Sequence, residues 1–347
     1  MPKTYGNLWP SITSWENLHS AYLEARKGKR YTAGVMNYTE HLEENLTNLQ
    51  NHLAWKTWQP GDFRSFWVYE PKKRMIQAPC FADRAAHHAL YRVVFPLFER
   101  KFIRHSYACR KGKGTLAASN ALTVMLRKAQ TKWGKVYALK CDISRYFPSV
   151  HHNILTSILQ RTIRDQNVLW MCETALKCCG FSGRGMPIGS LTSQLFANVY
   201  LDQLDHYIKD GLGESFYVRY MDDFIILGKD KGTLKNDLIR IGSYLDEKLG
   251  LKLNPKTTIV PASQGLYFAG YRHWTTHRLP RKINVKRAKK RFARISRLYS
   301  TGKIGLEKVR SIVMSFLGYM QHCKSHKTTT STLARLSLVK CSGGNQC

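Results

Sequence analysis

Three acidic residues stand out by their type and by their position. Asp222 and Asp223 separate two short apolar stretches, 216–220 and 224–227, and Asp142 follows a third at 136–139. Adjacent carboxylates where strands end repel each other unless cations or hydrogen bonds compensate them. Carboxylate oxygens suit Mg²⁺, which keeps some waters and takes substrate phosphates into its shell. Two such ions stabilise the attacking and leaving oxygens of a phosphoryl transfer, so the pattern predicts that chemistry.

An Asp-Asp pair alone is more often a helix cap or a turn. Two neighbouring motifs favour the catalytic interpretation. The first is Asp142-Ile143-Ser144-Arg145-Tyr146-Phe147, an acid followed by two aromatic residues. The second is the Gly-bearing loop 185–194, which opens a helix. Its backbone N–H groups and serine hydroxyls can approach a template or a nucleotide closely.

In this order and spacing, the two motifs and Tyr220-Met221-Asp222-Asp223 resemble the palm motifs of reverse transcriptases, from about Tyr69 to Tyr271. The resemblance implies a right-hand polymerase that uses two Mg²⁺ ions, with Mn²⁺ as a substitute. Asp142, Asp222 and Asp223 would be catalytic, and the metal site would consist of Asp142, Ile143, Asp222 and Asp223.

The resemblance also assigns nucleotide and primer contacts. Arg74 and Lys256 would neutralise the incoming triphosphate, where the alternative is a solvated surface charge. Phe147 would pack under the sugar and exclude a 2′-hydroxyl, where the alternative is a plain core aromatic. Gly189 completes the nucleotide-binding set, and the primer grip would consist of Phe268, Gly270 and Tyr271.

Within the loop, Ile188, Ser190 and Gln194 are assigned to template contact and fidelity. With Ile188 and Gln194 at its ends, the string Ile-Gly-Ser-Leu-Thr-Ser-Gln resembles the same loop in the enzymes of diversity-generating retroelements. Those enzymes copy a template-repeat RNA into cDNA with misincorporation at adenines, for mutagenic retrohoming. The implied partners are template RNA, cDNA, dNTPs and a small basic helical accessory protein that is oligomeric. Retron, group II intron-like and phage-defence reverse transcriptases remain alternatives, as does a non-catalytic RNA-binding module with the same fold.

The charge balance is strongly basic. Fifty-five Lys and Arg face twenty-three Asp and Glu, which gives a formal charge of +32 and a pI near 10.0. A polyanion best neutralises such a charge, and nucleic acid is the expected one. No apolar run reaches the roughly 18 residues that span a bilayer, and the N-terminus has no signal-type stretch. We therefore expect a cytoplasmic protein with no membrane partner and with reduced cysteines. The resemblance implies that the cell is bacterial or phage-infected.

Helices and strands are intermixed without a βαβ rhythm, which predicts an α+β fold with an antiparallel sheet. Helices are expected over 15–58, 82–98, 151–179, 191–209 and 234–249, and strands at 66–69, 75–76, 136–139, 216–220, 224–227, 257–260 and 266–271. The expected divisions are an N-terminal extension with fingers at 1–135, interleaved with a palm at 136–275, and a basic helical thumb with a tail at 276–347.

The segment 278–310 holds thirteen Lys or Arg and a single acid, Glu307. On a helix, one set of basic residues would share a face while Ala288, Phe292, Ile295 and Tyr299 line another. The alternative is a merely solvated face, but charge of one sign beside an apolar stripe favours contact with a nucleic-acid backbone. The residues of this basic face are Lys286, Lys290, Arg294 and Arg297.

Overall fold

The structure, a computed structural model, describes residues 3–69, 73–177 and 183–339. The chain forms two compact units. The first is built from segments 1–114, 140–225 and 235–258, and the second from 115–139, 226–234 and 259–347. The division passes through three strands and the first turn of one helix, namely β3 (Tyr137–Asp142), β5 (Asp223–Gly228), β6 (Thr258–Pro261) and α11 (Lys231–Leu249).

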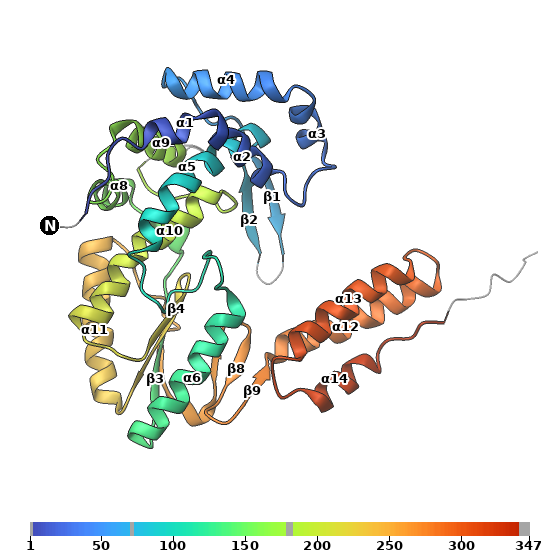
Figure 1. Ribbon diagram of the computed structural model, residues 1–347. Helices are drawn as coiled ribbons and strands as arrows, with labels where there is room; N and C mark the ends of the chain where they lie inside the picture. Colours follow the sequence, from blue (N-terminus) through green and yellow to red (C-terminus); the bar gives the residue numbers. More distant parts are fainter. Residues whose placement is uncertain (1–2, 70–72, 178–182, 340–347) are drawn as a thin grey trace, which may run out of the picture. The chain divides into compact units, whose positions relative to one another are not determined.

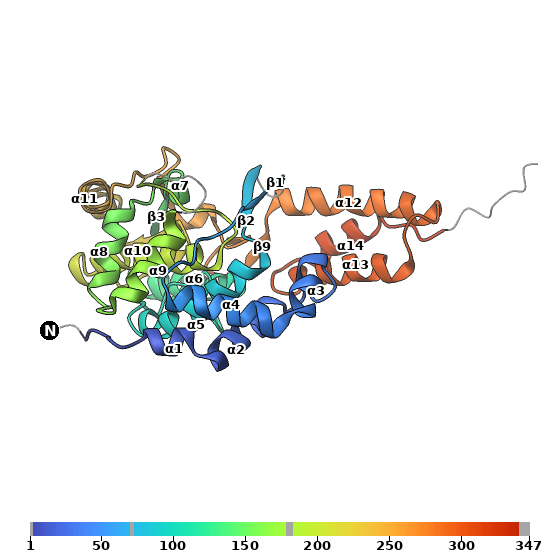
Figure 2. The ribbon, with the colours of Figure 1, turned by 90° about the horizontal axis from the view of Figure 1, so that it is seen from above.

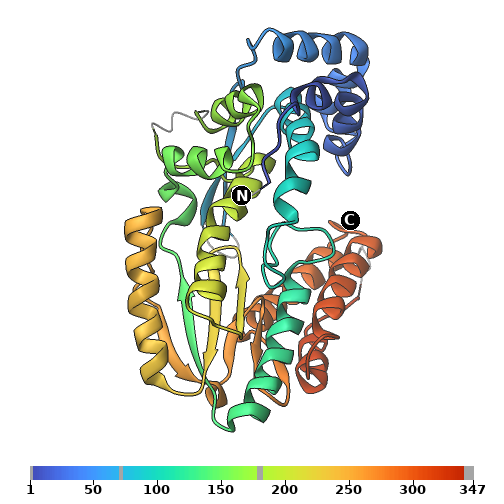
Figure 3. The same cartoon turned by 60° about the vertical axis from the view of Figure 1, so that its left-hand side comes forward.

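The N-terminal part of the first unit is a group of helices around α5 (Phe81–Glu99) (Figures 1 and 3). Ala85, Leu90 and Val94 of α5 are fully buried, because the helix is contacted by each of the four that precede it. Their bounds are α1 Trp9–Thr13, α2 Trp15–Ala25, α3 Ala33–Glu40 and α4 Leu42–Ala54. The serine before α2 caps that helix, since its hydroxyl accepts a hydrogen bond from the backbone N–H of Asn17.

The hairpin expected around residues 66–76 is present. Strands β1 (Arg64–Val68) and β2 (Arg74–Ala78) pair antiparallel, with Phe66 opposite Ile76. Most of its residues are exposed, including the aromatic rings of Phe66 and Trp67. The middle of the basic turn, residues 71 and 72, lies outside the described residues.

The rest of the first unit is mostly helical. Helix α10 (Leu191–His206) is the most buried of these helices, because twelve of its sixteen residues are buried and even Asp205 is fully buried. The expected helix at 191–209 continues from Tyr207 as a π-helical turn. The other elements are α7 Tyr146–Ser149, α8 His152–Gln160, α9 Gln166–Lys177, η2 Tyr207–Gly211 and α11 Lys231–Leu249.

Four strands form one sheet in the order β4-β5-β3-β6. Phe224, Ile225, Ile226 and Leu227 of β5 are all fully buried, as a continuous apolar run in an inner strand requires. The strands are β3 Tyr137–Asp142, β4 Tyr217–Tyr220, β5 Asp223–Gly228 and β6 Thr258–Pro261. This order places β5, which begins with Asp223, directly beside β3, which ends with Asp142.

The second unit contains a small antiparallel sheet in the order β7-β8-β9. The strand expected at 266–271 is divided by a tight turn at residues 269–270 into two strands. Helix α6 contacts β8 and is not among the elements expected from the sequence. The bounds are α6 Thr115–Trp133, η3 Ala262–Gln264, β7 Leu266–Phe268, β8 Tyr271–His273 and β9 Arg278–Pro280.

Helices α12 (Lys282–Ser300), α13 (Leu306–Met320) and α14 (His326–Leu333) end this unit, with α12 and α13 side by side (Figure 2). Phe292 and Ile295 of α12 are buried against Ile312 and Phe316 of α13. Their rings and methyl groups form the apolar stripe expected from the sequence. The four basic residues of the expected charged face are all exposed.

Two further expectations concern the whole chain. The five cysteines within the described part, at positions 80, 109, 141, 172 and 323, are all free thiols. In the same part of the chain, every helix is too short or too polar to cross a membrane.

Candidate active site

The Asp222-Asp223 pair lies in the turn between β4 and β5, two neighbouring strands. Only Met221 and Asp222 separate Tyr220, the last residue of β4, from Asp223, the first of β5. Met221 has a φ of 57°, in the left-handed region that few residues other than glycine adopt. The surrounding structure must therefore hold the backbone of this turn in place.

Asp142 is brought to this turn by hydrogen bonds of the main chain. The N–H of Ile143 donates to the carbonyl of Asp222 at 3.3 Å. Burial, followed by the charges of Asp142 and Asp223, raises the pKa of the Cys141 thiol, so both carboxylates lie near that side chain. The three predicted acids thus gather where β3 ends and β5 begins.

The carboxylates at this place suit a metal ion that takes part of its coordination shell from water and substrate. The described residues hold no group of three or more His, Cys, Asp or Glu spaced to enclose an ion unaided. Mg²⁺ does not need such a cage, because it retains waters and takes substrate phosphates as ligands. Carboxylates on adjoining strand ends are the donors that this mode of binding uses.

The carboxylate of Asp142 is oriented by Asn254. The amide Nδ2 of Asn254 donates to Oδ2 of Asp142 at 2.9 Å, and its backbone N–H donates to the Asp142 carbonyl at 2.7 Å. The Oδ1 of Asn254 accepts from the backbone N–H of Lys256 at 3.0 Å. Asn254 therefore connects the predicted triphosphate lysine, whose side chain is exposed, to Asp142, the first of the predicted metal-binding acids.

Phe147 lies on the short helix α7, directly after the Asp142 strand. It is half-buried, its ring meets the ring of Tyr146 edge to face at 5.7 Å, and its carbonyl accepts from the N–H of Met186. Tyr146 is anchored in turn, because its hydroxyl donates to the carbonyl of Ala197 at 2.6 Å. A ring fixed in this way can act as a rigid wall, and its contact with a sugar stays a prediction.

The glycine loop is held against the hairpin strand β2. The N–H of Gln77 donates to the carbonyl of Ile188 at 2.8 Å. A Cβ on Gly189, whose φ is +133°, would stand 2.7 Å from the carbonyl oxygen of Gln77. Glycine is therefore required for this close approach. Arg74 begins the same strand and is exposed.

Ser190 has a different environment from Ile188 and Gln194, the two other loop residues predicted to contact the template. It is buried, and its hydroxyl lies 3.0 Å from Nδ1 of His87 and 2.8 Å from the hydroxyl of Thr192. In this conformation Ser190 fastens the loop to α5, while Ile188 and Gln194 are half-buried. A template contact of these three residues remains a prediction.

A cavity of about 480 Å³ opens beside this loop. Gly189 and Gln194 line it together with apolar atoms of Phe66 and Ile76 from the hairpin. Among the residues that the structure describes, its lining also carries three cations and no acid. These cations are Lys29, Arg64 and Arg84. Burial and the charge of Arg84 lower the pKa of Lys29, so these two cations are close enough to repel each other and would accept an anion.

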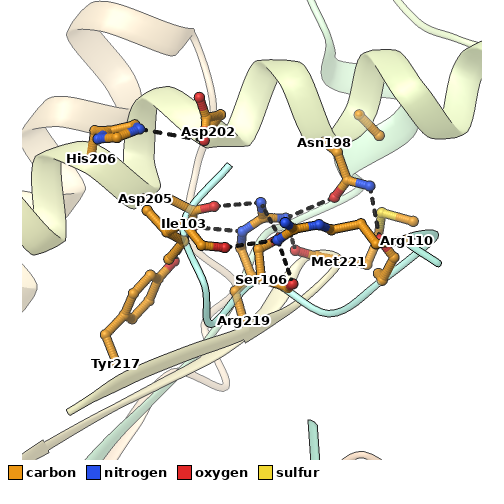
Figure 4. A network of polar contacts seen from close by, with 12 residues as sticks. Ile103, Ser106, Arg110, Asn198, Asp202, Asp205, His206, Tyr217, Arg219 and Met221 are labelled. Carbon is orange, nitrogen blue, oxygen red and sulfur yellow. Dashed lines mark hydrogen bonds and ion pairs between the residues drawn. The ribbon is translucent and has the colours of Figure 1, made fainter. Parts of the chain in front are cut away.

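A buried polar network contacts the backbone of Met221, the residue before the Asp222-Asp223 pair (Figure 4). Arg219 of β4 forms a two-pronged ion pair with Asp205 of α10, with Nε–Oδ1 at 2.7 Å and Nη2–Oδ2 at 2.6 Å. Its Nη1 donates to the carbonyl of Met221 at 3.0 Å and its Nη2 to the hydroxyl of Ser106 at 3.1 Å. A charged residue inside an otherwise apolar strand was the sequence signal that could have revealed this network.

The predicted primer-grip residues form the β7–β8 turn in the second unit. Ala269 and Gly270 both have positive φ, as the type I′ form of a two-residue hairpin turn requires. The hydroxyl of Tyr319 on α13 donates to the carbonyl of Gly270 at 2.6 Å. The rings of Tyr271 and Tyr319 stack with their centroids 4.9 Å apart. Phe268 is buried below this turn.

Known proteins resemble this chain over most of its length. Protein YkfC of Escherichia coli is 25% identical over 67% of this chain and 71% of its own length. The putative COX1/OXI3 intron 2 protein of Saccharomyces cerevisiae is 22% identical over 76% of this chain, and the group II intron-encoded protein LtrA of Lactococcus lactis is 23% identical over 56%. The matched regions are 36% and 33% of those two proteins, so the chain corresponds to about a third of each.

Among solved structures, apo telomerase from Candida tropicalis superposes with a TM-score of 0.53 at 13% identity, over 85% of this chain and 61% of that one. The likeness confirms the expected α+β right-hand polymerase fold. The family model described as "Reverse transcriptase (RNA-dependent DNA polymerase)" matches residues 69–273, more than half of the chain, with all three acids inside the match. The chain therefore belongs to the reverse transcriptase family.

Proposed function

We propose that this protein is an active RNA-directed DNA polymerase whose metal-binding residues are Asp142, Asp222 and Asp223, with the backbone of Ile143. The observation that carries the proposal is the hydrogen bond between Ile143 and Asp222, which joins the two acid-bearing strand ends. Two Mg²⁺ ions held there, or Mn²⁺ in their place, would supply Lewis-acid stabilisation of the attacking and leaving oxygens.

The other side chains bind and orient the substrates. Arg74 and Lys256 neutralise the triphosphate of the incoming dNTP, and Phe147 packs under its sugar and excludes a 2′-hydroxyl. The turn of Phe268, Gly270 and Tyr271 positions the primer. The basic face of α12 follows the nucleic-acid backbone, where each neutralised phosphate releases counterions.

We further propose that the template strand passes the cavity beside the glycine loop. Its three cations suit phosphates, and the apolar atoms of Phe66 and Ile76 suit a base or a sugar. Ile188 and Gln194 then stand next to the template. Because Ile188 can only pack, a polar contact that would discriminate between bases is lost there, on the scale of one hydrogen bond or about 1–1.5 kcal/mol.

Such a template environment suits a polymerase of a diversity-generating retroelement. In that role the enzyme copies a template-repeat RNA with misincorporation at adenines, and the cDNA serves mutagenic retrohoming. A small basic helical accessory protein, itself an oligomer, would assist it. The support is the loop sequence around Ile188 and Gln194.

A group II intron-like function is the second candidate, and the comparisons favour it. LtrA is by its name a group II intron-encoded protein, and another relative is an intron protein of COX1/OXI3. The DNA around the gene separates the two candidates. A nearby pair of repeats that differ at adenines, with a small helical gene, supports the retroelement, whereas flanking intron RNA sequence supports the intron function.

Primer extension tests the polymerase activity itself. The protein is given a DNA primer on an RNA template, dNTPs and Mg²⁺, and is compared with Asp222→Asn. A matched control is Asp246→Asn, which removes an exposed acid of α11. We expect incorporation by the native chain and the control, and none by Asp222→Asn. If the native chain binds the RNA but incorporates nothing, it is a non-catalytic RNA-binding module.

The fidelity proposal needs its own measurement. On a template that contains all four bases, the native chain should misincorporate mainly opposite adenine, and Ile188→Gln should lower that error rate. Ile188→Val, which keeps an apolar side chain, serves as the control. An unchanged adenine error rate in Ile188→Gln would remove the proposed role of this position.

A further inference from the structure

Arg219 is the largest of the fully buried side chains, and its guanidinium is bonded on all three nitrogens. Two nitrogens bind Asp205, and Nη1 reaches both the Met221 carbonyl and, at 3.4 Å, the Oδ1 of Asn198. Nη2 also binds Ser106. These partners come from helix α10, from the segment before α6 and from the turn itself (Figure 4).

The bond to Met221 acts on the residue with the most constrained backbone in the turn. Met221 has the left-handed φ of 57°, and Asp222 follows it directly. The direction in which the Asp222 carboxylate leaves the chain depends on the peptide between these two residues. The Arg219 bond to the Met221 carbonyl fixes the orientation of that peptide.

We propose that Arg219 is a positioning residue for the metal-binding acids, a role that rests on the proposed polymerase function. It holds the Met221–Asp222 peptide so that the Asp222 carboxylate faces Asp142. Asp205 neutralises the guanidinium, which would otherwise be an unpaired charge in the interior. The side chain does not touch the substrate or the ions and acts only through the turn.

An arginine is needed because one group serves several acceptors at once. Its planar fork binds both oxygens of Asp205 and still directs further N–H groups to Met221 and Ser106. A lysine at this position keeps the charge, but its single ammonium cannot span these positions together. Arg219→Lys therefore separates the positioning of the turn from the charge balance of the core.

A second arginine provides a matched control. Arg110 is also buried, with a two-pronged ion pair to Glu99 and bonds to the carbonyls of Ile103 and Ser106. Arg110 thus stabilises the same 103–110 segment as Arg219 does, but none of its hydrogen bonds reaches the turn. Arg110→Lys tests what general loosening of this region does.

The experiment measures Mn²⁺ binding by electron paramagnetic resonance, with a dideoxy-terminated primer on RNA and the next dNTP present, so that no turnover occurs. We expect Arg219→Lys to weaken Mn²⁺ binding by roughly tenfold or more, the usual effect of losing an outer-shell partner of a metal site. Arg110→Lys and Ser106→Ala, both of which leave the Met221 bond intact, should stay within about twofold of the native chain by the same scale.

The proposal is overturned if folded Arg219→Lys binds Mn²⁺ like the native chain, or if Arg110→Lys weakens binding equally. Should Arg219→Lys not fold, the double variant Arg219→Gln with Asp205→Asn removes both buried charges together and is judged in the same way. Failure of the proposed polymerase function is a separate result. It shows as absence of dNTP incorporation by the native chain, whatever the Mn²⁺ affinities of the variants.

Discussion

The guanidinium of Arg219 and the carboxylate of Asp205 form an ion pair in which neither side chain has any exposed surface. The pair joins strand β4 to helix α10. Burial works to lower the pKa of Arg219, but Asp205 outweighs it and raises that pKa above the ordinary arginine value. The Arg219 guanidinium therefore stays charged inside the protein.

Removing one partner of this pair should destabilise the fold severely. Arg219→Met leaves the Asp205 carboxylate buried without its counter-ion, so we expect a loss of about 3–5 kcal/mol in the free energy of unfolding. The double variant Arg219→Met with Asp205→Leu should recover a large part of it. Urea unfolding measures both. An exposed pair, Glu173 with Lys177 at 4.0 Å, is the control and should contribute at most about 1 kcal/mol.

Asn254 should matter for catalysis more than its neutral side chain suggests. It donates a hydrogen bond to the Asp142 carboxylate, and a bond to a charged group is worth about 1.5–3 kcal/mol. We expect Asn254→Ala to slow single-turnover dNTP incorporation by roughly ten- to a hundredfold and to raise the Mg²⁺ concentration needed for half-maximal rate. Asn153→Ala, which truncates an exposed asparagine of α8, should change neither. An unchanged rate in Asn254→Ala would mean that Asp142 needs no such support.

Local patterns in the sequence predicted much of this structure. The alternation of basic and apolar residues predicted α12, because a helix sorts such residues onto two faces, and Phe292 and Ile295 are indeed buried. Two apolar runs separated by a few residues predicted β4 and β5. The three acids could be grouped from the sequence because each lies where a strand ends.

Contacts between distant residues were not predictable in this way. Arg219 meets Ser106 across more than a hundred residues, and no local period encodes such a pair. The same holds for Tyr319, whose hydroxyl donates to the Gly270 carbonyl in the predicted primer-grip turn. Ser190 was assigned to the template by its place in a loop, and its burial against His87 depends on how that loop packs on α5.

His87 should make the stability of the protein depend on pH. Complete burial, helped by the charge of His88, lowers the pKa of His87 to about 3. Below the unfolded pKa of roughly 6.5 the unfolded chain binds a proton that the folded chain does not, so stability falls as the pH drops from 6.5 toward 3. This histidine contributes a slope of about 1.4 kcal/mol per pH unit in that window.

The measurement is the difference between the native chain and His87→Gln in urea unfolding at pH 7.5, 6 and 5. The difference matters because Asp202 and Glu214, whose pKa values are raised to about 7 by burial, give a slope of opposite sign in both proteins. At pH 7.5 the variant shows only its packing cost. We expect that cost to shrink by about 2 kcal/mol by pH 5, since a glutamine, unlike the histidine, binds no proton when the chain unfolds. A constant difference across the three pH values would contradict the neutral, buried state of His87.

The basic face of α12 should govern how RNA binding depends on salt. All four of its charged residues are exposed and their helix is fixed by the core beneath it, so they can reach phosphates without rearrangement of the fold. On single strands, log K falls by about 0.7 per tenfold increase in salt for each phosphate neutralised. Replacing Lys286, Lys290, Arg294 and Arg297 by glutamine should therefore reduce the slope by about 3, together with a large loss of affinity at low salt. The slope is obtained from RNA affinities between 50 and 200 mM KCl, roughly the range over which such contacts are resolved.

Glutamine at four exposed lysines on other helices removes the same net charge and is the control, at Lys128, Lys132, Lys235 and Lys248. If both quadruple variants lose the same slope, the chain attracts RNA through its net charge of +32 and not through this face.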